Sequence, residues 1–299
     1  METQWPLVIF TLFVCLTCGT LGGMSILALK GQGRNLQMTA LITSAVSLVV
    51  GGIGAFLHLE HWERIFNGFG HLTSGITQEL IAIVVLAAVA VAYLVMLRKS
   101  DDGASVPKWL ALLSVALSVV LVAVMAHSYT MAARPAWDSV LWILYVLGNA
   151  CVLGPATFRF IMAAAPPAGQ PAGRAADAGA PAGLAALVGA AANALAALAF
   201  AIFLQLSAGS FAGVGYYFDP THPTRAMADA AATVGAQAPL LWLGAVAVGA
   251  VVPLAAAFLG RRSGNWRLWA PVAIIAALIG AVCMRVAFYN LGLSVFMFY

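Results

Sequence analysis

The sequence predicts an all-α integral membrane protein, a bundle of eight transmembrane helices. Hydrophobic residues make up 63% of the 299 residues and charged residues only 8%, against roughly 45–50% and 25% in soluble domains. The mean hydropathy is +0.98. So few charges cannot cover a soluble particle of 31.0 kDa. The composition therefore excludes a soluble enzyme, a disordered chain and a nucleic-acid-binding protein, and it makes membrane lipid the first partner of this chain.

Eight separate apolar stretches are each long enough to cross a bilayer, which takes roughly 20 residues of helix for about 30 Å of hydrocarbon. The second stretch is rich in glycine, which is common in membrane helices because it lets neighbouring helices approach closely. We expect helices over residues 6–29, 38–58, 76–97, 108–130, 138–163, 183–207, 239–260 and 267–289.

The basic residues predict the orientation of the bundle. If the N-terminus lies outside, ten of the 14 Lys and Arg residues fall on the inner side and four on the outer side. The outer four are Arg64, Arg134, Arg225 and Arg285. Because cytoplasmic loops carry an excess of Lys and Arg, we expect both termini to be extracytoplasmic in a multi-pass protein of the cytoplasmic membrane.

A segment rich in Pro, Gly and Ala divides the chain. Residues 164–182 show no hydrophobic period, and such composition is typical of a flexible linker, here on the cytoplasmic side. Residues 1–163 then form a five-helix part that carries most polar groups. Residues 183–299 form an alanine-rich part of three helices, which we interpret as a scaffold.

The cysteines predict no metal centre in this chain. Cys15 and Cys18 form a C-x-x-C pair, but they lie in an apolar helix, which favours a buried, unreactive pair. Cys151 and Cys283 also lie in apolar stretches, so no set of four thiolates exists to ligate an iron–sulfur cluster. We therefore expect neither a cluster nor another metal site.

Polar residues gather on the predicted outer side, which holds all five histidines: His58, His61, His71, His127 and His222. His58 directly follows the second apolar stretch, and Glu79 lies inside the third. Ionisable groups at membrane depth are candidates for function. A quinol must lose two protons as it loses two electrons, and an imidazole and a carboxylate can each accept a hydrogen bond from one hydroxyl.

Other interpretations of these residues stay open. Charged side chains at a membrane interface can simply be solvated. His58 and His127 could face each other across a b-type haem, which would make the chain a haem-containing quinol-oxidising anchor. A transporter or scaffold without redox chemistry is a third class, although carriers usually hold ionisable groups near mid-membrane. Arg285 lies about 27 Å along its span from Arg267, near the outer boundary, where it could pair with Glu79 or reach the interface.

Several short motifs together resemble one family. The opening residues 2–11, the segment Ala28-Leu-Lys-Gly31 and the pair His58-Leu59, followed by Arg64-x-Phe66-Asn67 and Glu79, are similar to the membrane anchor subunit of dimethyl sulfoxide reductase, DmsC. Tyr129 and the later Pro135-x-Trp137 resemble it too. The likeness is carried mainly by the first five spans. Glu60 and His61 depart from the small residues that the family usually has there, and His127 stands where we expect an arginine.

The resemblance implies eight helices with both termini outside, no haem, and menaquinol bound near the outer face. It also implies an assembly with an iron–sulfur subunit, which receives the electrons, and a molybdopterin subunit, which reduces the terminal acceptor in anaerobic respiration. His58 falls on the family's quinol-site histidine and Glu79 on its essential glutamate. We expect these two to take part in the chemistry of quinol oxidation. The expected quinol-binding set is His58, Arg64, Glu79, His127 and Tyr129.

The charge asymmetry makes the topology testable. A protease site or epitope inserted within residues 164–182 should be reached only from the cytoplasmic side of sealed membranes, because ten of the 14 basic residues flank that side. Labelling of the tag from outside in intact cells would reverse the orientation and, with it, the outer placement of His58 and Glu79.

Overall fold

The computed structural model describes residues 4–59, 61, 67, 70–100, 105–164, 172–206 and 230–292, with backbone alone for 172–180 and 230. Every regular element in these residues is helical, and eight helices are long and apolar enough to cross a membrane. The predicted all-α fold class and the number of spans are thus confirmed. In a bilayer this is expected, because a helix satisfies its own backbone hydrogen bonds.

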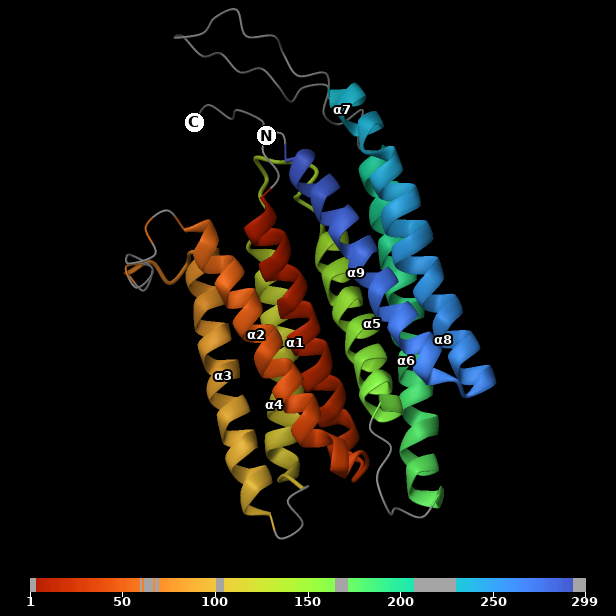
Figure 1. Cartoon of the computed structure of the whole chain (residues 1–299). Helices are drawn as coiled ribbons and strands as arrows, with labels where there is room; N and C mark the ends of the chain where they lie inside the picture. Colours follow the sequence, from red (N-terminus) through yellow and green to blue (C-terminus); the bar gives the residue numbers. More distant parts are fainter. Residues whose placement is uncertain are drawn as a thin grey trace, which may run out of the picture.

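The helices run side by side in one bundle (Figure 1). Their bounds are α1 Trp5–Leu29, the short helix η1 Arg34–Leu36, α2 Gln37–His58, α3 Gly75–Lys99, α4 Lys108–His127, α5 Val140–Ala164, α6 Ala172–Leu206, α7 Ala230–Ala236, η4 Leu240–Val251, α8 Val252–Ser263 and α9 Trp266–Asn290.

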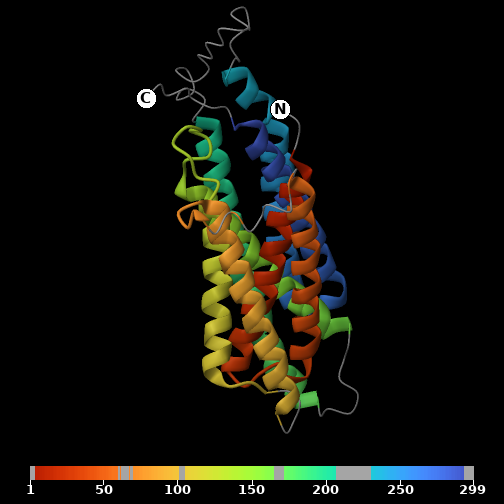
Figure 2. The ribbon, with the colours of Figure 1, turned by 90° about the vertical axis from the view of Figure 1, so that its left-hand side faces the viewer.

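Helix α1 lies at the centre of the first half of the bundle. It packs against α2, α4 and α5, while α3 packs mainly on α4, as the view turned by 90° shows (Figure 2). Accordingly, α1 is largely buried, whereas α2 and α3 present many apolar side chains on the outside. Valine and isoleucine side chains exposed there, such as Val49 and Ile53, fit contact with lipid.

Small residues bring the backbones of α1 and α5 into direct contact. A Cβ atom added at Gly19 would overlap the Ala150 carbonyl and the backbone at Gly154, and one added at Gly154 would overlap the backbone of Gly19. The same kind of contact joins Gly249 and Gly280, between η4 and α9. Close approach over small residues is a main source of helix association in membranes, because apolar burial gives little advantage there.

Helix α5 connects the two halves, since it packs against α1 on one side and against α6 and α9 on the other. Two buried asparagines fix the contact with α6: Asn149 Nδ2 donates to Asn193 Oδ1 at 2.8 Å. Asn193 Nδ2 in turn donates to the Gly249 carbonyl at 3.1 Å. Pro253, four residues after Gly249, has no N–H to offer that carbonyl, so the Asn193 amide takes the place of the missing backbone donor.

Two predicted boundaries differ from the structure. Helix α6 begins at Ala172, so the predicted linker 164–182 is helical from that residue on. Alanine has the highest helix propensity, which outweighs the lack of apolar periodicity. The seventh span is also longer than 239–260, reaching from Ala231 to Ser263, and residues Leu240–Val251 form a wider π-helix. The π-helix ends just before Pro253, where an α-helical hydrogen bond could not form.

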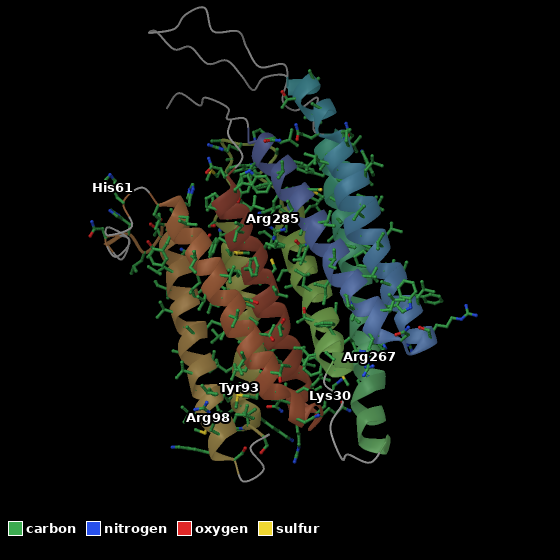
Figure 3. All side chains as sticks on the ribbon, in the orientation of Figure 1. Lys30, His61, Tyr93, Arg98, Arg267 and Arg285 are labelled. Carbon is green, nitrogen blue, oxygen red and sulfur yellow. The ribbon has the colours of Figure 1, made fainter. Side chains whose placement is uncertain are left out.

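The bundle has two ends, and the candidate site lies at one of them. Helix α1 begins and α9 ends at the same end, whereas Lys30 and Arg98 lie at the opposite end (Figure 3). Helices α2 and α4 finish, and α3 starts, at the end where α1 begins (Figure 1). We call this the terminal end. It is the end that the charge distribution predicts to be extracytoplasmic, and it is where the candidate site lies.

The α1–α5 contact predicts that alanine is tolerated much less well at Gly19 than at Gly23 of the same helix. Gly19→Ala should lower the free energy of unfolding by about 1–3 kcal/mol, because the new methyl group overlaps the backbone of α5. Gly23→Ala is the matched control, since no atom lies within 4 Å of the added Cβ. Thermal unfolding of both variants in detergent measures the effect, and equal stabilities would contradict this packing.

Candidate functional site

Glu79 is buried at the terminal end of the bundle. It lies one turn inside α3, with 9% of its surface exposed, and its carboxylate is hydrogen-bonded to the hydroxyl of Ser128, the residue that follows α4. Gly75 makes this contact possible, because a Cβ atom there would lie 2.7 Å from the Ser128 Cβ. The missing side chain at the start of α3 thus lets α3 approach the end of α4.

Ser128 can serve both protonation states of Glu79. Its hydroxyl oxygen also lies 2.8 Å from the Met125 carbonyl. When Glu79 is ionised, Ser128 donates its proton to the carboxylate. When Glu79 is protonated, the carboxyl group can donate to Ser128, which then donates to Met125. Because a hydroxyl both donates and accepts, Glu79 can gain or lose a proton without losing its hydrogen-bond partner.

Tyr129, the next residue, belongs to an aromatic cluster with α9. Its ring makes edge contacts with Trp137, Phe288 and Tyr289, with centroids 6.4, 6.2 and 6.1 Å away. Trp137 stacks on Phe288 at 4.7 Å, and its indole Nε1 donates to the Phe288 carbonyl at 2.6 Å. Trp142 of α5 stacks on the same phenyl ring at 3.8 Å. We call these five residues the aromatic cluster.

The surroundings of Tyr129 keep its hydroxyl protonated. Desolvation raises the pKa of Tyr129 well above its usual range, and the neighbouring Tyr289 and Glu79 raise it further, while Arg285 opposes the shift. A tyrosine in this state remains a hydrogen-bond donor at any physiological pH. Tyr289 of α9 contacts the Tyr129 ring, and Glu79 of α3 is bonded to the adjacent Ser128. The site therefore combines α3, the segment after α4, and α9.

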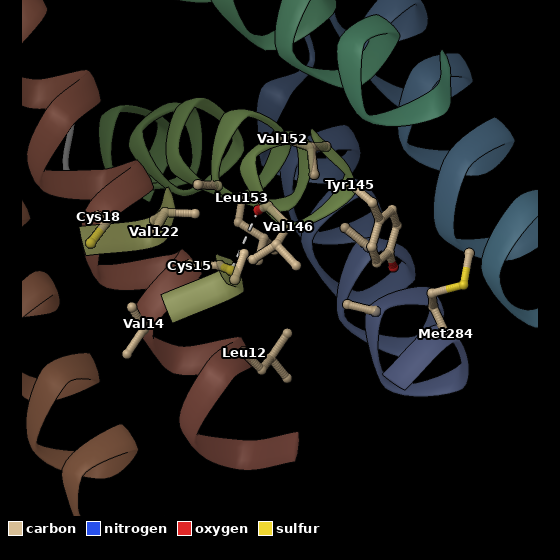
Figure 4. Packing of buried hydrophobic residues seen from close by; sticks show 14 of the residues in the cluster. Leu12, Val14, Cys15, Cys18, Val122, Tyr145, Val146, Val152, Leu153 and Met284 are labelled. Carbon is tan, nitrogen blue, oxygen red and sulfur yellow. Dashed lines mark hydrogen bonds between the residues drawn. The ribbon is translucent and has the colours of Figure 1, made fainter. Parts of the chain in front are cut away.

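An apolar layer lies beside the cluster, between α1, α5 and α9. Figure 4 shows Cys15 beside Val146, whose carbonyl is 3.5 Å from the Cys15 sulfur, and Tyr145 and Met284 where α5 meets α9. Cys15 and Cys18 are fully buried, as predicted, at 0% and 2% exposure. Cys151 is exposed and Cys283 is intermediate.

The histidines of the predicted set lie at the margin of the site. His58 is the last residue of α2 and His127 the last residue of α4, and both are exposed. His127 interacts with Thr130 through Nδ1 and the hydroxyl oxygen, 3.1 Å apart. Arg64, like Glu60 and His222, lies outside the described residues. Of the five predicted binding residues, Glu79 and Tyr129 are brought together.

Arg285 lies near the end of α9, at the predicted height, but it neither pairs with Glu79 nor reaches the interface, the two alternatives that the sequence leaves open. Its exposure is 0%, and it lies between α1, α5 and α9 in the part of the bundle nearer the terminal end (Figure 3). It bonds to Thr11 and Asn149 rather than to Glu79. Counting residues along a span gives the height of a side chain, but not whether it faces lipid or protein.

Within the described part of the chain, no three His, Cys, Asp or Glu residues come together in a group that could hold a metal ion. The chemistry that this part can offer is that of protons and hydrogen bonds: a buried carboxylate, a serine hydroxyl that relays, and tyrosine hydroxyls among flat aromatic rings.

Fold and site together define a multi-pass membrane protein with a buried proton-accepting group and an aromatic cluster at one end. The chain belongs to the family of DMSO reductase anchor subunits (DmsC), whose model matches residues 1–175. The match extends over α1 to α5 and includes Glu79, Ser128 and Trp137, whereas α9 with Arg285, Phe288 and Tyr289 lies beyond it. A comparison with curated proteins found no match.

Sequence reasoning missed Ser128, Phe288 and Tyr289. A lone serine at a helix end and two aromatic residues in an apolar span carry no signal by themselves. Trp137 was noticed as part of Pro135-x-Trp137, but its partner across 151 residues could not be predicted. The contact of Gly75 with Ser128 could not be predicted from the sequence either, because it depends on how α3 packs against the end of α4.

Two substitutions separate the hydrogen bond of Trp137 from its stacking. Trp137→Phe should lower the free energy of unfolding by about 1 kcal/mol, because the bond to the Phe288 carbonyl is lost while a ring stays. Trp137→Ala should cost about 3–5 kcal/mol, because the stacked ring is lost as well. Chemical denaturation followed by near-UV circular dichroism measures both, and equal losses would show that the ring contributes nothing.

Proposed function

We propose that this chain oxidises menaquinol at the terminal end of the bundle and passes the electrons to an iron–sulfur subunit. That subunit would feed a molybdopterin subunit, which reduces the terminal acceptor of anaerobic respiration. The membership in the DmsC family supports the role as the membrane anchor of such a heterotrimer. The chain itself would not act on the terminal acceptor.

The relay between Glu79 and Ser128 carries the proposal. Quinol oxidation releases two protons with two electrons, so the site needs a base that can be charged and neutral in turn. Glu79 is buried near the end of a membrane span, and Ser128 can donate to its ionised form and accept from its protonated form.

The surroundings of the relay suit a lipophilic ring. Tyr129 offers a hydroxyl that stays protonated and can donate to a ring oxygen, and the aromatic cluster gives flat apolar surfaces beside it. Two large apolar side chains are exposed around the start of α3: Leu72 is 63% and Ile76 is 65% exposed. A quinol could therefore reach this end sideways from the bilayer.

In this proposal His58 binds the second ring oxygen. It ends α2 at the same end of the bundle at which α3 begins, and α2 packs against α3. As a neutral imidazole, it can accept a hydrogen bond from one quinol hydroxyl while Glu79 takes the proton of the other. The proposed binding set is completed by Tyr129 and by Arg64 and His127, which the predicted topology also places on the outer side.

The charge asymmetry supports the proposed location. The terminal end lacks most of the basic residues, so the positive-inside rule favours the outer side of the cytoplasmic membrane for it. The iron–sulfur and molybdopterin subunits would then dock on the outer face. A quinol site near that face keeps electron transfer to a docked cluster short.

Substitutions at the two central residues test the function. His58→Arg and Glu79→Lys should leave the complex assembled and active with an artificial donor that reduces the catalytic subunits directly. Turnover with a menaquinol analogue should be lost, because one ring oxygen loses its partner and the proton acceptor becomes a cation. Glu79→Gln should also lose it, because the amide cannot accept a proton although it keeps a partner for Ser128.

Asp138→Asn is the matched control. Asp138 is an exposed carboxylate at the same end of the bundle, two residues before α5, and its loss should leave turnover with menaquinol analogues within about twofold of the parental rate, as expected for a surface substitution. Parental turnover in both His58→Arg and Glu79→Lys would place the quinol site elsewhere.

A further inference from the structure

Arg285 is a cation inside the helix bundle. It lies five residues before the end of α9, about 8 Å along the helix, and none of its surface is exposed. Charged side chains at membrane depth are costly and usually mark a function. The family match ends at residue 175, so nothing in it assigns a role to this arginine.

Every partner of the guanidinium is neutral. Nε donates to Thr11 Oγ1 at 2.8 Å and Nη1 to Asn149 Oδ1 at 2.7 Å. The Ala281 carbonyl, the Thr11 carbonyl and the Cys15 sulfur accept at 3.1, 3.4 and 3.5 Å. Glu79 and Asp138 are the acidic side chains that the structure describes, and neither forms an ion pair with Arg285 there. Within the described residues, the hydrogen bonds of the guanidinium are satisfied by neutral groups and no carboxylate pairs with its charge.

Holding helices together does not require this charge. One step along the same network, Asn149 and Asn193 link α5, α6 and η4 through amide groups alone. A neutral amide would therefore serve as a link at a much lower cost of desolvation than a guanidinium that has no carboxylate partner among the described residues. The positive charge itself is the feature that packing leaves unexplained.

The charge lies next to the proposed quinol site. Tyr289 follows Arg285 by four residues and therefore lies on the same face of α9, one turn nearer the end. Tyr289 makes an edge contact with Tyr129, and the residue before Tyr129, Ser128, is bonded to Glu79. The cation of α9 and the carboxylate of α3 thus lie on either side of the same pair of tyrosines.

We infer that Arg285 is an electrostatic positioning residue of the quinol site, where its fixed positive charge stabilises the negative charge that develops on the quinol ring. This inference rests on the proposed function. The first proton of the quinol goes to the Glu79 carboxylate, which leaves an anionic ring oxygen. The two electrons then pass one at a time to oxidised clusters of the iron–sulfur subunit, through a semiquinone, the second proton leaves for water, and a neutral quinone remains.

A pair of substitutions tests the charge in the whole complex in membranes. Arg285→Gln keeps a polar group and removes the charge, whereas Arg285→Lys keeps the charge and loses most of the hydrogen bonds. A unit charge acting over roughly 10 Å at an effective dielectric constant near 20 changes a rate on the order of tenfold. Arg285→Gln should therefore lower kcat with a menaquinol analogue about tenfold, and Arg285→Lys should stay within about threefold of the parental rate.

Two further measurements separate electrostatics from structure. Activity with an artificial donor to the catalytic subunits should be unchanged in both variants. The semiquinone radical signal in a redox titration should weaken in Arg285→Gln and persist in Arg285→Lys. Asn193→Ala is the matched control: it breaks the neighbouring amide link without changing any charge, and it should leave kcat with the menaquinol analogue within about twofold, since no charge near the ring changes.

Parental kcat in Arg285→Gln would overturn the inference, and so would equal losses in Arg285→Gln and Arg285→Lys, since these would show a structural role. If Glu79→Gln does not turn over the menaquinol analogue while Arg285→Gln does so at the parental rate, the proposed function is supported and the role of Arg285 is refuted. If the parental complex itself does not oxidise the menaquinol analogue, both fall together.

Discussion

The arrangement of the candidate site depends on one buried hydrogen-bond network, in which the Arg285 side chain of α9 meets Thr11 of α1 and Asn149 of α5. It joins α9 to the first helix of the chain and to α5, the helix that links the two halves of the bundle. In a bilayer, an arginine without these partners would have to leave the bundle for the interface. The contact therefore fixes the rotation of α9 about its axis, and this rotation turns Phe288 and Tyr289 toward Trp137 and Tyr129.

The sequence predicts the helices well and their contacts poorly. Hydropathy places six of the eight span starts within about four residues, because the bilayer demands a long apolar run. It fails at α6, where alanine extends the helix into a segment whose Pro and Gly content predicts a linker, and at the seventh span, which begins at Ala231 rather than at residue 239. Glu79 and Tyr129 could be predicted because polar residues in or near spans are rare. Ser128 and Tyr289 could not, since their roles arise only where α3, α4 and α9 meet.

The two halves of the chain contribute different parts of the candidate site. The matched region, residues 1–175, supplies the carboxylate, its serine partner and the tryptophan. The last helix supplies the phenylalanine and tyrosine that surround Tyr129, together with the arginine behind them. The scaffold role of residues 183–299 stays a prediction, but the described contacts of Phe288 and Tyr289 make α9 a part of the candidate site.

Separate burial of Glu79 and Arg285 has a chemical consequence. Had the two side chains formed an ion pair, each would have neutralised the other, and the carboxylate would have been a poor proton acceptor. Instead, Arg285 is satisfied by hydroxyl, amide and carbonyl oxygens, and Glu79 by a serine hydroxyl. In the proposed mechanism, the carboxylate is then free to take a proton from the quinol, and the positive charge is available to the ring that has lost it. The neutral hydrogen bonds around both groups are what keep the acid and the cation apart.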